Sequence, residues 1–471
     1  MKTFRLVSAL LAFLTLWACG KSNPDPVPEP TPDPAPKAIT LSSSSISVKA
    51  EGGSFEVTVK SPFVPQVAKP DWVTVQAGIL QNYSVTVTVT VSANTTYDPR
   101  TAELTFSATG ATSAKLSVSQ EAAEKPDVPP TGEIGRKLVT ANPHPRAQAL
   151  YDYLYGLYGS QTLSSVMAEV NWNHKLADAV AKTTGKFPAM NCYDFIHIYV
   201  PKNNWIDYSD LTPVTEWADA GGIVSLMWHF NVPVNQATTP GADGSGVTCT
   251  PTQTTFRARN VFTEGSWENK WFYGQMDKVA DIILALQAKG IPAVWRPFHE
   301  AAGNATYKQQ ASWATAWFWW GYDGADVFKK LWQAMFDYFA SKGINNLVWV
   351  WTSQNDNGNA SLYNPDRDWY PGDAYVDVVA RDLYGYTSAR NLSEFTELQK
   401  TYPTKMITLG ECGKDVQENG TTDFAKVSEL WNAGAKWSWF MPWYGASFPD
   451  DAWWRDAMGS AAVVNRSQVK F

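Results

Sequence analysis

The sequence predicts an α/β protein in which a (β/α)8 TIM barrel follows a small immunoglobulin-like β-sandwich. Two observations support this prediction. Residues 38–123 alternate apolar and polar residues with the two-residue period of β-strands, and residues 134–471 alternate strand-like with helix-like segments. The length of 471 residues suits two or three domains joined by short linkers.

The start of the chain has the features of a signal peptide, predicted over residues 1–19. Two basic residues precede an apolar run at 6–17, which is too short to span a bilayer and ends just before Cys19. The letters LWAC resemble the lipobox of bacterial lipoproteins, in which the cysteine is lipidated. We therefore expect Cys19 to anchor the mature chain to the outer membrane, on the cell surface or the periplasmic face. The alternative is an ordinary signal peptide that contains a cysteine by chance.

Two proline-rich linkers are predicted, and they enclose the β-sandwich. Residues 20–37 contain NPDPVPEPTPDPAP, which favours an extended spacer, and residues 124–133 form a second, shorter linker. Between them, residues 38–123 resemble the BACON domain through DWVTV, NTTYDPRTAELTFS and LSVSQEA. This resemblance implies carbohydrate or mucin binding. Because Trp72 is the only tryptophan of the segment, we favour a rigid spacer instead.

The predicted barrel, residues 134–471, contains eight strand-like segments separated by segments such as FYGQMDKVADIILALQAKG, whose apolar residues have helical spacing. Eight strands that alternate with helices predict a (β/α)8 barrel, and the active site of such a barrel lies at the C-terminal ends of the strands. The predicted strands are residues 160–166, 187–195, 221–230, 291–300, 346–353, 376–386, 405–411 and 436–443.

Composition narrows the classes of partner. The net charge is −7 and no basic stripe is present, so we expect no nucleic acid partner. Only Trp17 and Trp72 of the 23 tryptophans lie in the first 130 residues, and the others fall in the predicted barrel. Tryptophan fills large cores and also stacks on sugar rings, and we expect most of these residues in the core. A monomer without a cofactor is expected.

Carboxylates and aromatic residues lie where the predicted strands end. Strand four ends in WRPFHE, which contains Arg296 and Glu300, and strand seven ends in LGE with Glu411. Glycoside cleavage requires two carboxyl groups beside the scissile bond, one protonated and one ionised. Arg296 shares the strand parity of Glu300, so both should face the barrel axis, where a buried cation keeps a carboxylate ionised. The other strand-end residues are His229, Asp382, Tyr384 and Trp443.

Each of these residues also has a simpler explanation. A single strand-end glutamate can cap the following helix, but two of them, on strands four and seven, favour catalysis. His299 beside Glu300 could indicate a metal site, yet neighbours on a strand point to opposite faces and no HExxH motif is present. No metal is expected. Three cysteines besides Cys19 form no CxxC pair and allow at most one disulfide: Cys192, Cys249 and Cys412.

The motifs WRPFHE at 295–300, LGE at 409–411 and WFWWG at 317–321 resemble glycoside hydrolase family 26. The resemblance covers about 134–471. Many relatives have a shorter segment where this chain has residues 301–316, which leaves the neighbouring sugar subsites open. The resemblance implies these roles: Glu300 as acid/base, Glu411 as nucleophile, and His229, His299, Trp317, Tyr384 and Trp443 as substrate-binding residues, with Tyr384 bonded to the nucleophile and Trp443 beneath the sugar.

The resemblance also implies the substrate. The family consists mainly of retaining endo-β-1,4-mannanases that act on mannan, galactomannan or glucomannan, with a minority that cleave mixed-linkage β-glucan or β-1,3-xylan. The residues do not choose between these polysaccharides. An alternative of another class is a non-catalytic glycan-binding lipoprotein, which should have lost one of the two carboxylates. Retention requires the two carboxyl groups to lie about 5–5.5 Å apart.

Overall fold

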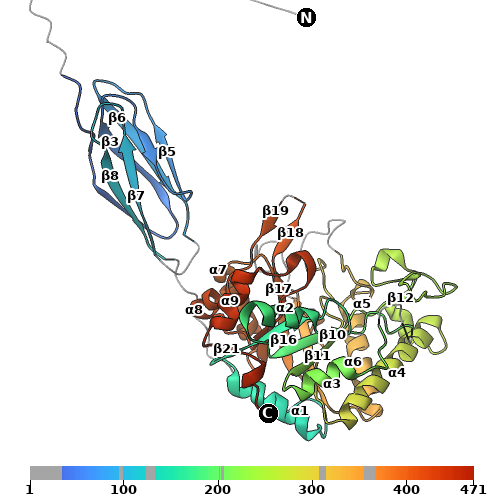
Figure 1. The fold of residues 1–471 in the computed structure, drawn as a ribbon. Helices are drawn as coiled ribbons and strands as arrows, with labels where there is room; N and C mark the ends of the chain where they lie inside the picture. Colours follow the sequence, from blue (N-terminus) through green and yellow to red (C-terminus); the bar gives the residue numbers. More distant parts are fainter. Residues whose placement is uncertain are drawn as a thin grey trace, which may run out of the picture. The chain divides into compact units, whose positions relative to one another are not determined.

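The computed structural model describes residues 34–94, 99–122, 133–200, 202, 206–306, 315–354, 366–418 and 420–471. Cys19 and most of both predicted linkers lie outside these ranges, so their roles and the domain boundaries stay predictions. The described residues form two compact units, a β unit and a larger α/β unit (Figure 1). No helix in the described ranges has the length and apolar character needed to cross a membrane.

The β unit contains two four-stranded sheets, with the orders β1-β3-β6-β5 and β2-β8-β7-β4. Its strands follow the predicted two-residue alternation: β6 buries its valines and leaves its threonines exposed or half-buried. A small all-β unit is therefore confirmed. The strands are β1 Thr40–Leu41, β2 Ser45–Val48, β3 Gly53–Lys60, β4 Gln66–Ala68, β5 Val73–Ala77, β6 Ser84–Val91, β7 Arg100–Ser107 and β8 Ala114–Gln120.

The α/β unit is built on eight parallel strands in the order β17-β16-β15-β14-β11-β10-β9-β20. The sheet closes because β20 and its flanks also bond to β17: Ser438 N donates to Ile407 O at 2.9 Å, and Cys412 N donates to Met441 O at 3.0 Å. Every strand overlaps a predicted one. They are β9 Thr162–Met167, β10 Met190–Asp194, β11 Ile223–Trp228, β14 Ala293–Pro297, β15 Leu347–Ser353, β16 Val378–Tyr384, β17 Met406–Gly413 and β20 Trp439–Phe440.

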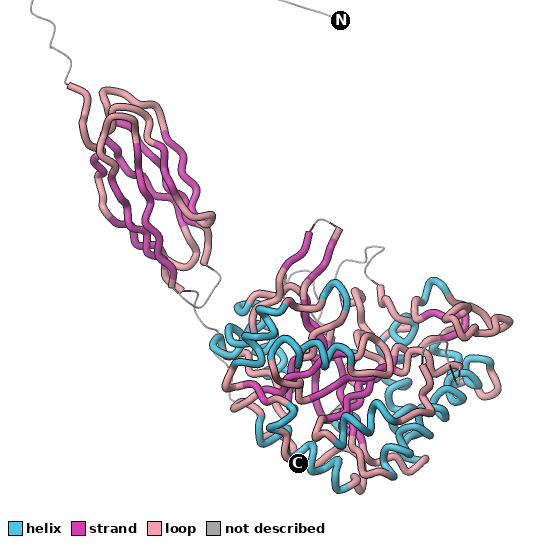
Figure 2. Tube along the Cα trace, in the orientation of Figure 1, coloured by secondary structure: helices cyan, strands magenta, loops and turns pink. Residues whose placement is uncertain are grey.

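Helices surround these strands, as the cyan and magenta segments of Figure 2 show. Local sequence starts several of them: the Ser266 hydroxyl caps α4 by accepting from Asn269 N, and Asp450 caps α9 in the same way. The helices are α1 Pro145–Leu157, α2 Lys175–Thr184, α3 Thr212–Asp219, α4 Trp267–Ala288, α5 Trp319–Tyr322, α6 Ala325–Ser341, α7 Ser388–Thr401, α8 Val427–Ala433 and α9 Asp451–Gly459. Short strand pairs are β12 Val232–Pro233 with β13 Val247–Thr248, β18 Asp415–Gln417 with β19 Gly420–Thr422, and β21 Val463–Val464 with β9.

Tryptophans fill the space between helices and strands, as the composition predicts. The fully buried ones are Trp217, Trp228, Trp295, Trp319, Trp320, Trp332, Trp351 and Trp454. Burial of an indole removes a large apolar surface from water, so these residues contribute strongly to the stability of the barrel. Trp317 is an exception because it is exposed.

Candidate active site

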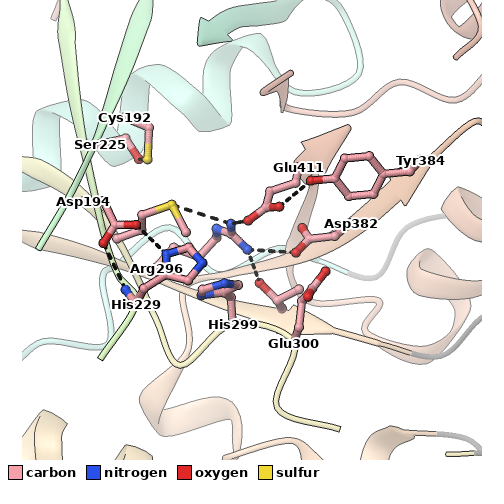
Figure 3. A network of polar contacts seen from close by, with 12 residues as sticks. Cys192, Asp194, Ser225, His229, Arg296, His299, Glu300, Asp382, Tyr384 and Glu411 are labelled. Atoms are coloured by element: carbon pink, nitrogen blue, oxygen red, sulfur yellow. Dashed lines mark hydrogen bonds and ion pairs between the residues drawn. The ribbon is translucent and has the colours of Figure 1, made fainter. Parts of the chain in front are cut away.

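The C-terminal ends of the barrel strands bring together five of the predicted site residues, which are His229, His299, Glu300, Tyr384 and Glu411 (Figure 3). Strand β14 ends at Pro297, three residues before the predicted end of this strand. Phe298 and Glu300 then adopt positive φ angles of 48° and 50°, which are uncommon for residues other than glycine. The prediction that Glu300 shares the strand alternation of Arg296 is therefore wrong, because Glu300 follows the strand. A strained turn, a feature that often marks functional sites, instead brings its carboxyl group to the carboxylates of Asp382 on β16 and Glu411 on β17.

An irregular pairing between β16 and β17 positions the second glutamate. The register shifts after Arg381, so that Asp382 pairs with Glu411 and Gly410 is the extra residue of a bulge. A Cβ atom on Gly410 would lie 2.6 Å from Asp382 Oδ1, so no larger residue fits without a shift. The bulge allows Glu411 to face Asp382 although Gly410 also faces the interior, which is how bulges beside active sites re-aim side chains.

Arg296 on β14 links the strands across the barrel interior. Its guanidinium donates to Asp382 Oδ2 at 3.0 Å and to Thr352 Oγ1 at 2.9 Å, and it also forms an ion pair with Glu411. The other oxygen of Glu411 accepts a hydrogen bond of 2.6 Å from the Tyr384 hydroxyl. Both oxygens of Glu411 are therefore held by donors on other strands, and the predicted cation beside this carboxylate is present.

Three carboxyl groups lie close together beside Arg296, which bonds to two of them. Single oxygens of Glu300, Asp382 and Glu411 lie within 4.8 Å of one another. Burial raises the pKa of Glu300 well above its usual range, and the charges of Asp382 and Glu411 raise it further, against Arg296. Burial also raises the pKa of Asp382, to about 7, although Arg296 lowers it. The cluster therefore retains a proton at neutral pH, and Glu300 is its site because Arg296 bonds to the other two carboxylates.

Among the described residues, the carboxylates of this cluster lie close enough together to bind a metal ion. The guanidinium of Arg296 already donates to two of its three members and provides the positive charge that an ion would otherwise bring.

A second polar pair lies beside the carboxylates. His229 follows β11, and its Nδ1 lies 2.5 Å from Oδ2 of the buried Asp194, which also accepts from the His229 backbone N–H at 3.0 Å. Burial lowers the pKa of His229, but the charge and hydrogen bond of Asp194 outweigh this effect and raise it. His299 lies with its ring centroid 4.5 Å from that of His229. Burial and the positive charges of His229 and Arg296 lower the pKa of His299 well below its usual range, so it is neutral.

Two tryptophans of the WFWWG segment donate hydrogen bonds to Glu300, the acid/base candidate, and to its neighbour His299. Trp317 Nε1 donates to Glu300 Oε2 at 3.1 Å, and Trp320 Nε1 donates to the His299 carbonyl at 2.9 Å. Gly321 is required because a Cβ atom there would lie 1.7 Å from the Ala301 carbonyl oxygen. Residues 307–314, half of the long segment at 301–316, lie outside the described ranges.

The structure thus gathers all seven predicted barrel residues. Trp443 is half-buried, with its ring centroid 5.8 Å from that of His229 and 5.2 Å from that of Tyr444. Sequence reasoning gave no role to Asp382 and missed Asp194, although both are carboxylates at strand ends, the signal that identified Glu300 and Glu411. The three cysteines of the barrel are free thiols.

Comparison with known families agrees with this geometry. The Glycosyl hydrolase family 26 model matches residues 139–469, and the BACON model matches residues 63–121. The chain belongs to glycosyl hydrolase family 26. Family 26 is a (β/α)8 barrel family, so the predicted barrel and the resemblances to family 26 and to the BACON domain are confirmed.

Several known proteins are similar to this chain. The mannan endo-1,4-beta-mannosidase of Thermothelomyces thermophilus is 30% identical over 331 residues, which cover 69% of this chain and 60% of that protein. The chain spans 48% to 60% of the length of this enzyme and two Piromyces mannosidases. Among solved structures, the GH26 domain of an endo-beta-mannanase/endo-beta-glucanase from Prevotella bryantii is 56% identical, with a TM-score of 0.69, and the match covers 72% of this chain and 100% of that domain.

Proposed function

We propose that the chain is a retaining endo-β-1,4-mannanase that hydrolyses mannan, galactomannan or glucomannan. The observation that carries this proposal is the separation of the Glu300 and Glu411 oxygens, within 4.8 Å. Retaining glycosidases place their two carboxyl groups about 5–5.5 Å apart, whereas inverting enzymes need roughly 6.5–9.5 Å to admit a water molecule. The short separation therefore favours direct attack by a carboxylate.

In the first step, a Glu411 carboxylate oxygen attacks the anomeric carbon. The bond from this carbon to the glycosidic oxygen breaks, its electron pair stays on that oxygen, and the proton of Glu300 is transferred to it. Arg296 and Tyr384 orient Glu411 through its two oxygens. Burial keeps the proton on Glu300 until the leaving oxygen arrives, because it raises the pKa of this carboxyl.

In the second step, Glu300 acts as a base. It takes a proton from water while the water oxygen bonds to the anomeric carbon and the bond to Glu411 breaks, which regenerates both carboxyl groups in their starting states. Two inversions give net retention. His229, held by Asp194, and the neutral His299 provide hydrogen-bonding groups beside this position.

The choice of mannan rests on the relatives. The similar proteins from Thermothelomyces thermophilus and Piromyces are mannan endo-1,4-beta-mannosidases, and the similar Prevotella bryantii domain belongs to an endo-beta-mannanase/endo-beta-glucanase. The test is the release of reducing ends from β-mannan, mixed-linkage β-glucan and β-1,3-xylan. We expect the fastest release from mannan. Faster release from glucan or xylan would contradict the substrate, and no release from any of them would favour a non-catalytic glycan-binding lipoprotein.

We further propose that a lipid on Cys19 attaches the enzyme to the outer membrane, that the β unit is an immunoglobulin-like spacer, and that the protein acts as a monomer. The LWAC motif supports the anchor. Replacement of Cys19 by Ser should move the protein to the soluble fraction with its activity intact. Retention of this variant in the membrane at high salt would contradict the anchor.

A further inference from the structure

The β unit exposes apolar side chains at one of its ends. Among the described residues of this unit, the large hydrophobic side chains that are exposed are Phe63 at 58%, Val64 at 49% and Ile79 at 84%. Phe63 and Val64 lie in the loop 61–65 between β3 and β4, and Ile79 lies in the loop 78–83 between β5 and β6. Single exposed apolar residues are normal on a protein surface, but a group of them indicates an interaction site.

The register of the strands places both loops at the same end. Strands β3 and β6 are antiparallel and pair Lys60 with Ser84, so the loop after β3 and the loop before β6 emerge together. Ser61 N also donates to Tyr83 O at 2.9 Å, which joins the two loops directly. We refer to loops 61–65 and 78–83 together as the apolar tip.

The backbone of the apolar tip is fixed by a tight turn. Gln81 and Ser84 exchange two backbone hydrogen bonds of 2.9 and 2.8 Å. Asn82 and Tyr83 between them have φ angles of 48° and 61°, as in a type I′ turn. Tyrosine rarely adopts this conformation, so the turn is strained. Because this turn is already fixed, the loop that carries Ile79 loses little further conformational entropy when it binds a partner.

The charges around the apolar tip have one sign. Loops 61–65 and 78–83 contain no Asp, Glu, Lys or Arg, and the neighbouring loop 108–113 contains none either. Thr112 of that loop donates its N–H to Lys37 O at 2.9 Å and accepts from Ile39 N at 2.8 Å, which places Lys37 at this end. Lys37 and Lys60 are both exposed there.

The chain also enters the β unit at this end. The bonds between residues 37–39 and Thr112 place the entry beside the apolar tip, whereas β8 runs away from it and ends at Gln120. The segment from Cys19 to Pro34 is proline-rich and could span at most about 45 Å if extended. A lipid at Cys19 would therefore hold this end of the unit near the bilayer.

We propose that the apolar tip contacts the lipid bilayer directly. Phe63, Val64 and Ile79 enter the boundary between headgroups and acyl chains, and Lys37 and Lys60 meet anionic headgroups. Apolar residues with flanking cations are the combination that binds membrane interfaces, and each basic residue near an anionic surface adds to the attraction. This contact does not depend on the lipid at Cys19 or on the activity of the barrel.

The test uses the chain from Gly20 onward, which keeps every described residue and lacks the lipid. Its flotation is measured with vesicles of phosphatidylethanolamine and phosphatidylglycerol. We expect the protein to float with the vesicles, and the double variant Phe63→Asp, Ile79→Asp to reduce the bound fraction at least about tenfold. The matched control is Phe262→Asp with Val416→Asp, which makes the same change at two exposed apolar positions of the barrel and should bind like the wild type.

Three results would overturn the proposal: no flotation of the wild-type chain, equal flotation of the tip variant and the wild type, or equal losses in the tip variant and the control. Hydrolysis of soluble mannan, measured on the same samples, should be the same for the wild type and the tip variant. Unchanged hydrolysis together with lost flotation supports a membrane surface. Loss of polysaccharide binding by the tip variant, with flotation intact, would identify a glycan-binding surface instead.

Discussion

Two adjacent layers of the barrel interior differ in chemistry although they come from the same strands. The lower layer is apolar and includes Val294, Val350 and Ala380. Two residues further along β14, β15 and β16, on the same faces, lie Arg296, Thr352 and Asp382, and Arg296 donates hydrogen bonds to the other two. The two layers have different roles. Packing of the apolar lower layer fixes the distances between the strands, and these distances bring the charged side chains of the upper layer together.

Removal of the carboxyl groups of Glu411 and Glu300, beside the upper layer, should have the largest effects on turnover. We expect Glu411→Ala to abolish turnover of every substrate. Glu300→Ala should reduce turnover of mannan by about 10²–10⁴-fold, the usual contribution of a general acid. Aryl mannosides with good leaving groups should lose much less in their first step, because they depart without a proton. With these substrates, azide should restore turnover of Glu300→Ala and give a β-azide, and equal losses on both substrate classes would contradict the assignment.

The bulge at Gly410 offers a way to disturb the geometry without removing charge. An added Cβ in Gly410→Ala would lie 2.6 Å from Asp382 Oδ1 and 3.0 Å from Ala380 Cβ, so the carboxylates must move apart. We expect kcat to fall by about 10²-fold, the size of effect that a 1 Å displacement produces. Gly274→Ala on α4 is the control, because nothing lies within 4 Å of its added Cβ. Similar kinetics for both variants would show that the bulge is not needed.

The pH dependence should report the excess of negative charge in the upper layer. Glu300 must be protonated to act as an acid, so kcat/KM should fall as pH rises through its pKa. After burial, the charge of Asp382 is the largest cause that raises this pKa. Asp382→Asn removes that charge, and the alkaline limb of the kcat/KM profile should therefore move to lower pH. A limb that stays in place or moves to higher pH would contradict the coupling.

The smallest effects should separate the two layers directly. Val350→Ala leaves a cavity in the lower layer and should reduce the free energy of unfolding by about 1–3 kcal/mol while kcat stays near the wild-type value. Thr352→Val, one layer higher, removes the hydroxyl that accepts from Arg296 and should lower kcat more than stability. Chemical denaturation and steady-state kinetics on both variants measure this. A larger loss of kcat in Val350→Ala and a larger loss of stability in Thr352→Val would contradict the separate roles of the two layers.

Much of this arrangement follows from the sequence, because neighbouring parallel strands end at the same side of a barrel. That rule alone brings Glu300, Glu411, His229 and Tyr384 near one another. It does not reveal which side chains touch. The pairs Asp194–His229 and Arg296–Asp382 join residues 35 and 86 positions apart, and they depend on the register between strands.

Sequence patterns also do not predict where the backbone departs from regular strand geometry. The left-handed conformations of Phe298 and Glu300 contradict the preferences of those residues and persist only because the surrounding packing imposes them. The bulge at Gly410 breaks the two-residue alternation of β17, so a count of strand positions would place Glu411 on the wrong face. Both departures lie at the site, where function outweighs local preference.

The configuration of the first product tests the central claim most directly. Proton NMR during hydrolysis of a mannooligosaccharide resolves the α and β anomers before they equilibrate. Attack by Glu411, followed by attack of water on the same carbon, predicts that the β anomer appears first. Initial release of the α anomer would mean a single displacement by water and would contradict the assignment of Glu411 as the nucleophile.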